Sequence, residues 1–511
     1  MVVKIITAAL QGIDATPVFC ETSVTNGCRV IMIGLPDTAV RESRDRIESA
    51  MRESGLKFPR KQVTINLAPA DVRKEGALYD VPIATAIMAA GAIIQTEKIA
   101  DYMLVGELSL DGSVKPVKGT LPFAILAREM KMKGIIVPRD NACEAAVVNN
   151  LDVLVADRLI DIIDFFNNKR DLEHVEINTR ELFYSSENNF AADFADVKGQ
   201  AQVKRAFAIA ASGGHNIIMV GPPGAGKSMM AKCLPSILPP LSLSEALETT
   251  KIHSVAGMRS ATGLITQRPF RSPHHSISSV ALIGGGTNPM PGEVSLAHNG
   301  TLYLDELPEF SRQVLEVLRQ PLEDRKITIA RAKSTVVYPS SVMLVASMNP
   351  CPCGYFTHPT KQCTCTAMQV QKYLGRISGP LLDRIDLQIE ISPLSFEEMS
   401  LNTVNEPSSA IRQRVVRARA IQEERYKDHP LIHCNAQMTS ALLRKYCELD
   451  DKALIVLKNA MSKLDLSARA YDRILKVSRS IADYEGEDKI TSTHIAEAIS
   501  YRNLDRRNRG L

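Results

Sequence analysis

The stretch Gly221-Pro222-Pro223-Gly224-Ala225-Gly226-Lys227-Ser228 decides the fold of this 511-residue chain. It has the pattern G-x-x-x-x-G-K-[ST], and it stands between an apolar run at 216–220 and a run of helix formers at 229–232. A strand, a glycine-rich loop and a helix in this order let backbone N–H groups and the positive helix end surround phosphates. The sequence therefore predicts an ATP site in which Lys227 reaches the outer phosphates and Ser228 holds Mg²⁺.

Two further apolar runs end in polar side chains. The run at 301–304 is followed by Asp305 and Glu306, and the run at 342–346 leads to Asn349. In an open α/β sheet, ligands bind beyond the carboxyl ends of the strands. We therefore expect Asp305 to complete the Mg²⁺ shell, Glu306 to orient and deprotonate the attacking water, and Asn349 to bond the γ-phosphate or that water. A solvated strand end and an asparagine that begins a turn before Pro350 are the alternatives.

Composition excludes several classes of protein. With 45% apolar and 23% charged residues, the chain has enough material for about three globular domains at ~150 residues each. The longest uncharged apolar stretch, between Asp80 and Glu97, is shorter than the ~20 residues that a bilayer requires, so it predicts a buried helix and no membrane partner. Ten cysteines without an N-terminal signal pattern indicate a reducing compartment, and we expect a cytoplasmic protein.

Changes of pattern along the chain divide it into four segments. Residues 1–168 alternate β-rich runs with helical patterns and predict an α/β domain. Residues 169–195 are polar with weak periodicity and predict a linker. Residues 196–395 carry the phosphate motifs, and 396–511 show helical periodicity without strands.

These motifs, in this order, resemble the AAA+ ATPases. In Gly379-Pro380-Leu381-Leu382-Asp383-Arg384 the resemblance implies that Arg384 is an arginine finger on a neighbouring subunit's nucleotide. In Ser467-Ala468-Arg469 it implies that Arg469 is a second sensor of the γ-phosphate, carried by the lid domain. A finger that acts between subunits implies a homo-oligomeric ring, because a monomer has an incomplete site. A less specific resemblance to the family's adenine-contacting stretch, around Val197, Gly199 and Gln200, implies that these residues contact adenine.

Two inserted segments indicate which branch of the AAA+ superfamily the chain resembles. The segment around Arg268-Pro269-Phe270-Arg271-Ser272-Pro273-His274-His275-Ser276 resembles the magnesium-chelatase-like insert. Adjacent histidines are expected to point apart, which disfavours a metal site there. Alternation of apolar and polar residues at 326–338 predicts a hairpin with a basic tip. We expect Arg331 and Lys333 at this tip to grip DNA phosphates, with an ordinary exposed hairpin as the alternative.

Four of the ten cysteines fall within fifteen residues, namely Cys351, Cys353, Cys363 and Cys365. Their C-x-C spacing departs from the C-x₂₋₄-C of common structural zinc sites. Four thiolates can still close a tetrahedral Zn²⁺ site and fold a loop that is too small for a core. A redox pair and unligated thiols are the alternatives.

From end to end, the chain resembles the YifB/ComM family of magnesium-chelatase-like AAA+ proteins. The stretches NPCPCGYF with CTC, RPFRSPHHS, HNGTLYLDELPEF and SGPLLDRID carry this resemblance. It implies an α/β fold with a P-loop AAA+ core and a helical C-terminal lid, preceded by a Lon-protease/ribosomal-S5-like α/β domain. That domain departs from Lon, since Leu78 stands where the nucleophilic serine is expected and Leu121 lies near the position of its partner lysine. Without a nucleophile and its base there is no covalent catalysis, so we expect a non-proteolytic module.

The resemblance also implies a function. It points to an ATP-driven ring, expected to be a hexamer, with helicase and branch-migration activity on single-stranded and branched DNA during natural transformation and recombination. The alternative is a magnesium-chelatase-like ATPase that remodels a partner protein during metal insertion. DNA-stimulated ATP hydrolysis favours the first class, and stimulation by a protein partner alone favours the second.

Overall fold

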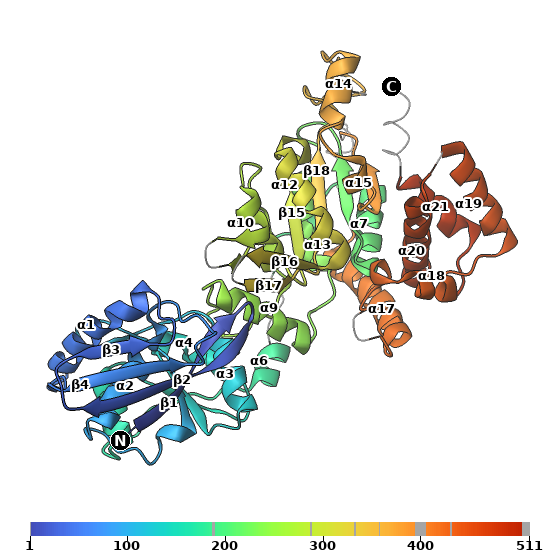
Figure 1. Cartoon of the computed structure of the whole chain (residues 1–511). Helices are drawn as coiled ribbons and strands as arrows, with labels where there is room; N and C mark the ends of the chain where they lie inside the picture. The colour runs from blue at the N-terminus through green and yellow to red at the C-terminus, as the bar shows by residue number, and fades with distance from the viewer. Residues whose placement is uncertain are drawn as a thin grey trace.

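The computed structural model of the chain separates into an N-terminal α/β unit, a central α/β unit and a C-terminal helical unit (Figure 1). The residues that it describes are 2–185, 190–286, 289–331, 334–356, 358–393, 405–429, 432–464 and 466–502. Within these stretches, no helix combines the length and the apolar character that a bilayer crossing needs.

The N-terminal unit is built on one sheet with helices against it. In spatial order its strands are β10 (Glu173–His174), β9 (Asp152–Val155), β8 (Gly134–Val137), β5 (Tyr102–Leu104), β1 (Val2–Gln11), β2 (Asp14–Thr25), β4 (Gln62–Ala68) and β3 (Val30–Ile33). Its helices are α1 (Thr38–Glu53), α2 (Asp80–Ala90), α3 (Thr120–Glu129), α4 (Arg139–Ala145) and α5 (Leu159–Phe166). Two very short strands, β6 (Glu107–Leu108) and β7 (Val114–Lys115), pair beside the sheet.

Helix α2 confirms the expectation of a buried helix. Every residue from Asp80 to Ala89 is buried, as a helix that is apolar on all sides requires. It ends at Gly91, well before Glu97, so the uncharged stretch is longer than the helix within it. Asp80 pairs with Arg46 at 2.7 Å, and burial raises the pKa of this carboxyl although the pairing with Arg46 opposes the shift.

Part of the expected linker is folded. Strand β10 pairs with β9, and helix α6 (Thr179–Ser185) follows it, both inside the segment 169–195. Val175, Ile177 and Leu182 pack against the core that contains α3 and α4. Side-chain burial thus continues beyond residue 168, a feature that the polar composition of the segment conceals. The domain boundaries themselves stay predictions.

A parallel sheet forms the centre of the second unit. Its strands, in spatial order, are β12 (Phe270–Arg271), β15 (Thr301–Leu304), β18 (Met343–Met348), β11 (Ile217–Val220) and β19 (Leu387–Glu390). All residues of β11, β15 and β18 are buried, which explains their continuous apolar character. The strands run in the same direction, so their carboxyl ends share one edge. The phosphate motif, Asp305 and Asn349 follow three of them directly.

Helices cover both faces of this sheet (Figure 1). The helices of this unit are α7 (Ala201–Gly213), α8 (Lys227–Ile237), α9 (Leu243–Val255), α10 (Ser279–Ile283), α11 (Glu293–Leu296), α12 (Arg312–Val317), α13 (Arg319–Asp324), α14 (Ala367–Leu374) and α15 (Gly379–Leu382). Of these, α14 projects beyond the end of the sheet and α9 lies toward the N-terminal unit (Figure 1). A small ladder of β13 (Gly284–Gly285) and β14 (Met290–Pro291) lies in the insert.

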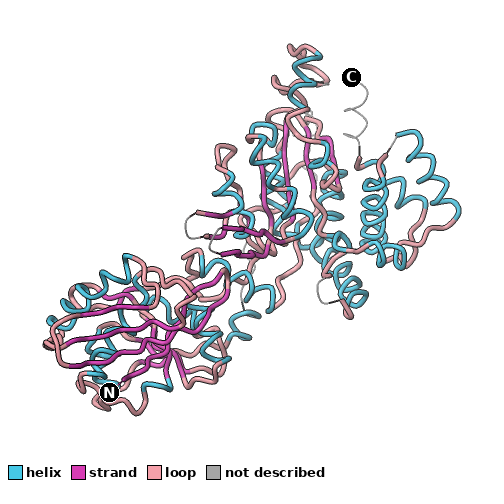
Figure 2. Tube along the Cα trace, in the orientation of Figure 1, coloured by secondary structure: helices cyan, strands magenta, loops and turns pink. Residues whose placement is uncertain are grey.

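The hairpin expected at 326–338 is confirmed. Strands β16 (Lys326–Arg331) and β17 (Ser334–Pro339) pair antiparallel, with Arg331 opposite Ser334 and a two-residue connection. Figure 2 shows this hairpin between the central sheet and the N-terminal unit. The β1–β2 turn reaches it, because a Cβ at Gly12 would stand 3.1 Å from a methyl carbon of Val336, and Ile13 packs against the same apolar cluster. The N-terminal unit is thus in direct contact with the hairpin.

Helix α9 joins the N-terminal and central units. Leu241, Ala246 and Leu264 belong to the same buried cluster as Phe123 of α3. The Ser254 hydroxyl donates a hydrogen bond to the buried carboxylate of Glu144, which also accepts the Leu121 N–H at 2.8 Å. Burial raises the pKa of Glu144, although these hydrogen bonds oppose the shift. The two units therefore share a core as well as a surface.

The C-terminal unit is helical, as expected. Its helices are α17 (Ser408–Tyr426), α18 (Ser440–Tyr446), α19 (Asp451–Leu464), α20 (Ala468–Glu485) and α21 (Ser492–Ser500). Ser467 caps α20 by accepting the Ala470 N–H, so this helix opens where the sequence predicts. Apolar residues of α17 and α20 form one cluster with α7 and α8 of the central unit.

Candidate active site

The predicted phosphate loop joins β11 to α8. Gly224 and Gly226 adopt φ of +80° and +82°, a region that glycine enters without strain. A Cβ at Gly224 would meet nothing within 4 Å, and no side chain caps the start of α8. The loop therefore presents open space beside Gly224 and a helix start that no side chain caps, which agrees with a phosphate cradle.

Lys227 is held inside this loop. Its ammonium group donates to the carbonyl oxygens of Gly221 at 2.6 Å and Pro222 at 3.0 Å, and to Oδ1 of Asn349 at 3.0 Å. Burial lowers the pKa of Lys227, and the charges of Asp305 and Glu306 oppose this shift. The structure thus brings together the lysine of β11–α8 and the asparagine that follows β18.

Ser228 and Asp305 form the candidate Mg²⁺ position. The Ser228 hydroxyl donates to Oδ2 of Asp305 at 2.9 Å, and Ser347 donates to Oδ1. Burial alone would raise the pKa of Asp305, but the hydrogen bonds from Ser347 and Ser228 outweigh it and hold the pKa below its ordinary value. A hydroxyl and an ionised carboxylate are oxygen ligands of the kind that Mg²⁺ prefers, so the residues fit the ion.

Glu306 follows Asp305 in a left-handed conformation with φ of +53°, which is uncommon for a glutamate. Its side chain is half exposed at the mouth of the site, and His275 Nδ1 lies 3.9 Å from Oε2. The expectation that His274 and His275 point apart is wrong, since their ring centroids are 4.0 Å apart. The two rings meet at a tilt of 36° because the chain turns sharply there: the Ile277 N–H donates to the His274 carbonyl. The insert therefore delivers His275 to the candidate base.

The stretch expected to contact adenine flanks the same loop. Val197 is buried, while Gly199 and Gln200 have positive φ and start α7. The Gln200 amide donates to the Ser392 carbonyl at 2.8 Å, just beyond β19. This bond ties the stretch to the carboxyl edge of the sheet.

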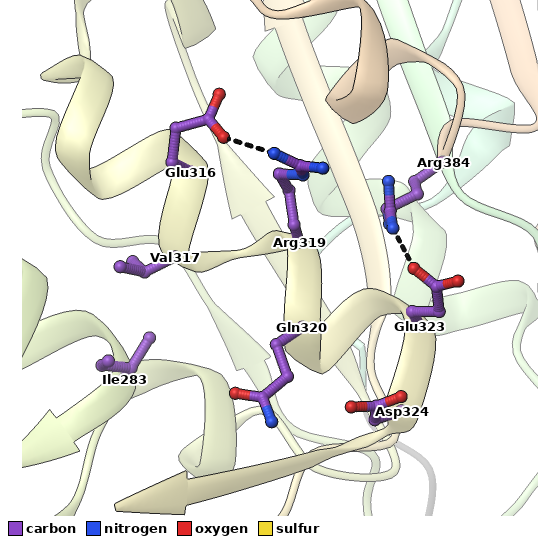
Figure 3. Close-up of a pocket in the computed structure, with 8 residues that line it drawn as sticks. All are labelled: Ile283, Glu316, Val317, Arg319, Gln320, Glu323, Asp324 and Arg384. Atoms are coloured by element: carbon purple, nitrogen blue, oxygen red, sulfur yellow. Dashed lines mark hydrogen bonds and ion pairs between the residues drawn. The ribbon is translucent and has the colours of Figure 1, made fainter.

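Arg384 lies in a different place. It is 7% exposed, and its guanidinium pairs with Glu323 of α13 and donates to the Pro380 carbonyl at 2.7 Å. Arg384 and Arg319 line one cleft of about 400 Å³, and Arg319 pairs with Glu316 at 2.8 Å (Figure 3). Burial lowers the pKa of Arg384, and the like charges of Arg319 and Arg469 lower it further. Arg319 and Arg384 therefore form one arginine face along this cleft, and the charge of Arg469 acts on Arg384.

Arg469 is exposed in the first turn of α20, on the C-terminal unit. Its electrostatic effect is on Arg384, and among the described residues the charges that act on Lys227 are those of Asp305 and Glu306. The structure thus brings the two predicted arginines near each other and places neither in contact with the chain's own lysine.

A buried network links this arginine face to the helical unit. His215 bonds Asp386 at 3.2 Å and Ser480 of α20 at 2.7 Å, and Arg473 of α20 also pairs with Asp386. Burial opposes ionisation of Asp386, but the charge of Arg473 and the hydrogen bond of His215 hold its pKa well below its usual range. Asp386 is two residues after Arg384, so movement of α20 is coupled to the segment that carries the arginine.

The remaining predictions concern the hairpin tip and the cysteines. Lys333 lies outside the described residues, and of Arg331 only the backbone position in β16 is described. The sulphur atoms of Cys351, Cys353, Cys363 and Cys365 all lie within 4.8 Å of one another. The hydrogen bonds from the Tyr355 and Thr364 N–H groups lower the pKa of Cys353 to about 5.

Sequence reasoning missed Ser347, Arg319 and His275. Ser347 precedes Asn349 by two residues in an extended segment, a spacing that puts two side chains on one face, and this signal could have identified it. Arg319 and His275 reach their sites through the tertiary fold, and no local pattern identifies them.

Comparisons with known proteins agree with this architecture. The family model described as magnesium chelatase, subunit ChlI, matches residues 193–399. Models described as subunit ChlI of Mg-chelatase and as its C-terminal part match residues 20–141 and 405–502. Over 506 residues, the chain is 43% identical to YifB of Escherichia coli K12, which covers 98% of this chain and 97% of the relative.

Two further relatives carry informative names. The competence protein ComM of Haemophilus influenzae is 42% identical over 501 residues, covering 98% of this chain and 97% of the relative. The magnesium-chelatase subunit ChlI of Mesostigma viride is 22% identical over 212 residues, covering 41% of this chain and 51% of the relative. The fold is a P-loop AAA+ core with a helical C-terminal lid, preceded by a Lon-protease/ribosomal-S5-like α/β domain. Full-length similarity on this fold shows that the chain belongs to the YifB/ComM family of magnesium-chelatase-like AAA+ proteins.

Proposed function

We propose that the protein is an ATP-driven motor that acts on single-stranded and branched DNA as a homo-oligomeric ring. The observation that carries this proposal is the meeting of Lys227, Ser228, Asp305 and Asn349 at the carboxyl edge of the central sheet. Glu306 stands beside them at the open side. This is the set of groups that ATP hydrolysis requires.

Each side chain has a defined task in the proposed reaction. Lys227 binds the outer phosphates, while Ser228 and Asp305 hold Mg²⁺, which neutralises phosphate charge when it is bound. Glu306 accepts a proton from the attacking water, and His275, 3.9 Å away, positions its carboxylate. Asn349 bonds Lys227 at 3.0 Å and reports on the γ-phosphate through this contact.

The arginine face supports a ring. The charges of Arg319 and Arg469 both act on Arg384, and Arg384 is paired with Glu323 within its own chain. We infer that a neighbouring subunit's triphosphate exchanges with Glu323 as the partner of Arg384, and that Arg469 acts on the same phosphate. The network from Asp386 to α20 then transmits the change to the helical unit.

The proposal that the motor acts on DNA rests on the hairpin and on the name of one relative in the family. The β16–β17 hairpin carries Arg331 and Lys333 toward its tip in sequence, and phosphates are natural partners for these two basic residues. The name of the relative ComM refers to competence, which agrees with handling of transforming DNA.

The test compares ATP hydrolysis of the full-length protein with and without forked DNA. We expect DNA to stimulate hydrolysis several-fold, and an Arg331→Ala/Lys333→Ala variant to lose this stimulation while its basal rate persists. Lys57→Ala/Arg60→Ala, which removes two exposed basic residues of the N-terminal unit, is the matched control and should respond like the wild type.

A second function is favoured by the match to magnesium-chelatase models, namely remodelling of a partner protein during metal insertion. This second function predicts that a protein partner stimulates ATP hydrolysis and that no nucleic acid does. Absence of a DNA response in the wild-type protein would therefore overturn the DNA-motor proposal and leave the ATPase itself intact.

A further inference from the structure

The segment between β18 and α14 is long, exposed and irregular. Its described residues from 350 to 366 form neither helix nor strand, and most of them are exposed or half-buried. A loop of this length with little apolar burial needs another source of order, since ordering each residue costs about 1–2 kcal/mol of backbone entropy.

Four thiols supply convergent ligands inside this loop. The sulphur of Cys351 lies 3.3 Å from that of Cys353 and 3.7 Å from that of Cys363, and Cys353 and Cys363 are 3.5 Å apart. With Cys365 included, all four lie within 4.8 Å. A tetrahedral centre with Zn–S bonds of about 2.3 Å requires sulphur separations of about 3.8 Å, whereas a disulfide requires about 2 Å. The observed spacing fits the edges of a metal tetrahedron.

The surroundings also resemble those of a thiolate centre. Cys351 is fully buried and its sulphur accepts the Phe356 N–H at 3.3 Å, while the other three are half-buried. Backbone N–H donors of this kind stabilise the negative charge of coordinated sulphur. The cluster is shielded from solvent at Cys351 and accessible from solvent at the other three cysteines, so that a metal ion can enter it.

The cluster adjoins the phosphate loop. Asn349, two residues before Cys351, bonds Lys227 at 3.0 Å. Gly354, at φ +83°, lies so close to the loop that a Cβ there would stand 2.5 Å from Cδ of Pro223. The cysteine segment thus supports the outer wall of the loop at Pro223 and its lysine at Asn349.

We propose that Cys351, Cys353, Cys363 and Cys365 bind one structural Zn²⁺ and that the metal holds this segment against the phosphate loop. Binding replaces four S–H bonds by four Zn–S bonds and releases the protons to solvent, with no change of oxidation state. The proposal is independent of the cargo, because it concerns how the nucleotide loop is supported.

The first test measures metal in the full-length protein. Elemental analysis should give about one zinc per chain, and Co²⁺ exchange should give the visible spectrum of a tetrahedral tetrathiolate centre. Cys363→Ser/Cys365→Ser should lose the metal, whereas the matched control Cys28→Ser/Cys143→Ser, which changes two exposed cysteines elsewhere, should keep it.

Three results would overturn the metal site. The first is that the wild-type protein contains no zinc and gives no tetrathiolate cobalt spectrum after reconstitution. The second is that it contains iron in place of zinc. The third is that alkylation under denaturing conditions shows the four cysteines paired as disulfides. Each is measured on the wild type, so misfolding of a variant cannot obscure the answer.

The second test addresses the support of the phosphate loop. Gly354→Ala should keep its zinc but bind a fluorescent ATP analogue about tenfold more weakly, a change of 1.4 kcal/mol, because Pro223 must move. Gly486→Ala is the matched control, since its φ is +79° and a Cβ there meets nothing within 4 Å. Removal of zinc by a chelator should weaken binding of the analogue in the same direction. Unchanged affinity in both experiments would overturn the supporting role and leave the metal site.

Discussion

At the scale of single residues, the site depends on how Glu306 is placed. It occupies a left-handed conformation beside the half-buried Asp305, whose pKa is held below its ordinary value, and its carboxylate faces His275. Strain of this kind costs about 1–3 kcal/mol and persists where the surrounding structure fixes it, often at catalytic positions. Glu306 is held at the open side of the site, with its neighbour turned inward to Ser228.

Replacement of Glu306 tests its role as the base. Glu306→Gln should lower the rate of ATP hydrolysis by about 10²–10⁴-fold with little change in nucleotide affinity, since it removes proton transfer and keeps the shape. The control is Glu309→Gln, an exposed glutamate of the next turn that pairs with Arg376 at 3.0 Å. Hydrolysis by Glu306→Gln at the wild-type rate would assign the base elsewhere.

His215 makes stability depend on pH. Burial lowers its pKa, the hydrogen bond and charge of Asp386 oppose this shift, and the charges of Lys476 and Arg473 add to it. The unfolded chain, with a histidine pKa of about 6.5, therefore binds more protons than the folded one below that pH. The free energy of unfolding should fall as pH drops below about 6.5.

Thermal unfolding at a series of pH values measures this effect. His215→Asn should lower Tm throughout, because it breaks a buried network, and should also reduce the slope of Tm against pH below about 6.5. His174→Asn, at a half-exposed histidine of β10, should keep the wild-type slope. An unchanged slope in His215→Asn would show that other groups carry the pH dependence.

At the scale of elements, local pattern was sufficient for the strands and helices that surround the motifs. The runs before the phosphate loop, before Asp305 and before Asn349 became β11, β15 and β18, since continuous apolar runs are what buried parallel strands require. The pairing of Arg384 with Glu323 and the approach of His275 were not predictable, because they join elements far apart in sequence. The close approach of the His274 and His275 rings shows the same limit for a tight turn.

The junction of α9 with the N-terminal unit is a second element-scale feature. Gly263, with φ of +79°, lies so close to α4 that a Cβ there would stand 2.6 Å from the carbonyl carbon of Cys143. Gly263→Ala should destabilise this junction by about 2 kcal/mol or more, because strain and overlap add.

Limited proteolysis and thermal unfolding measure the effect, and we expect earlier cleavage between the two units. Gly76→Ala is the control, since its φ is +76° and a Cβ there meets nothing within 4 Å. Equal behaviour of the two variants would mean that the junction tolerates displacement.

At the scale of the whole molecule, Lys227 lies apart from Arg384 and Arg469 of the same chain. The proposed ATP sites between neighbouring subunits, called seams below, can therefore be tested by mixing subunits. Lys227→Ala and Arg384→Ala proteins should each hydrolyse ATP poorly. A mixture should regain activity, because about a quarter of the seams in a random ring join an intact loop to an intact arginine.

The measurement is the ATPase rate of the mixture after subunit exchange, compared with the separate proteins at the same total concentration. Mixing Lys227→Ala with Glu306→Gln is the control and should regain little, since both changes affect the same side of a seam. No recovery in the first mixture, with exchange verified, would mean that the arginine acts within its own chain.

The contact between the β1–β2 turn and the hairpin has a mechanical consequence. Gly12 lies against Val336 in the middle of β17 and Ile13 packs on the same apolar cluster, so the hairpin is supported from outside the central unit. In the proposed motor, any movement of the hairpin must either move the whole N-terminal unit with it or break and re-form this apolar contact in every cycle of ATP hydrolysis. The distance over which this apolar contact can slide would therefore limit the length of each step of the proposed motor.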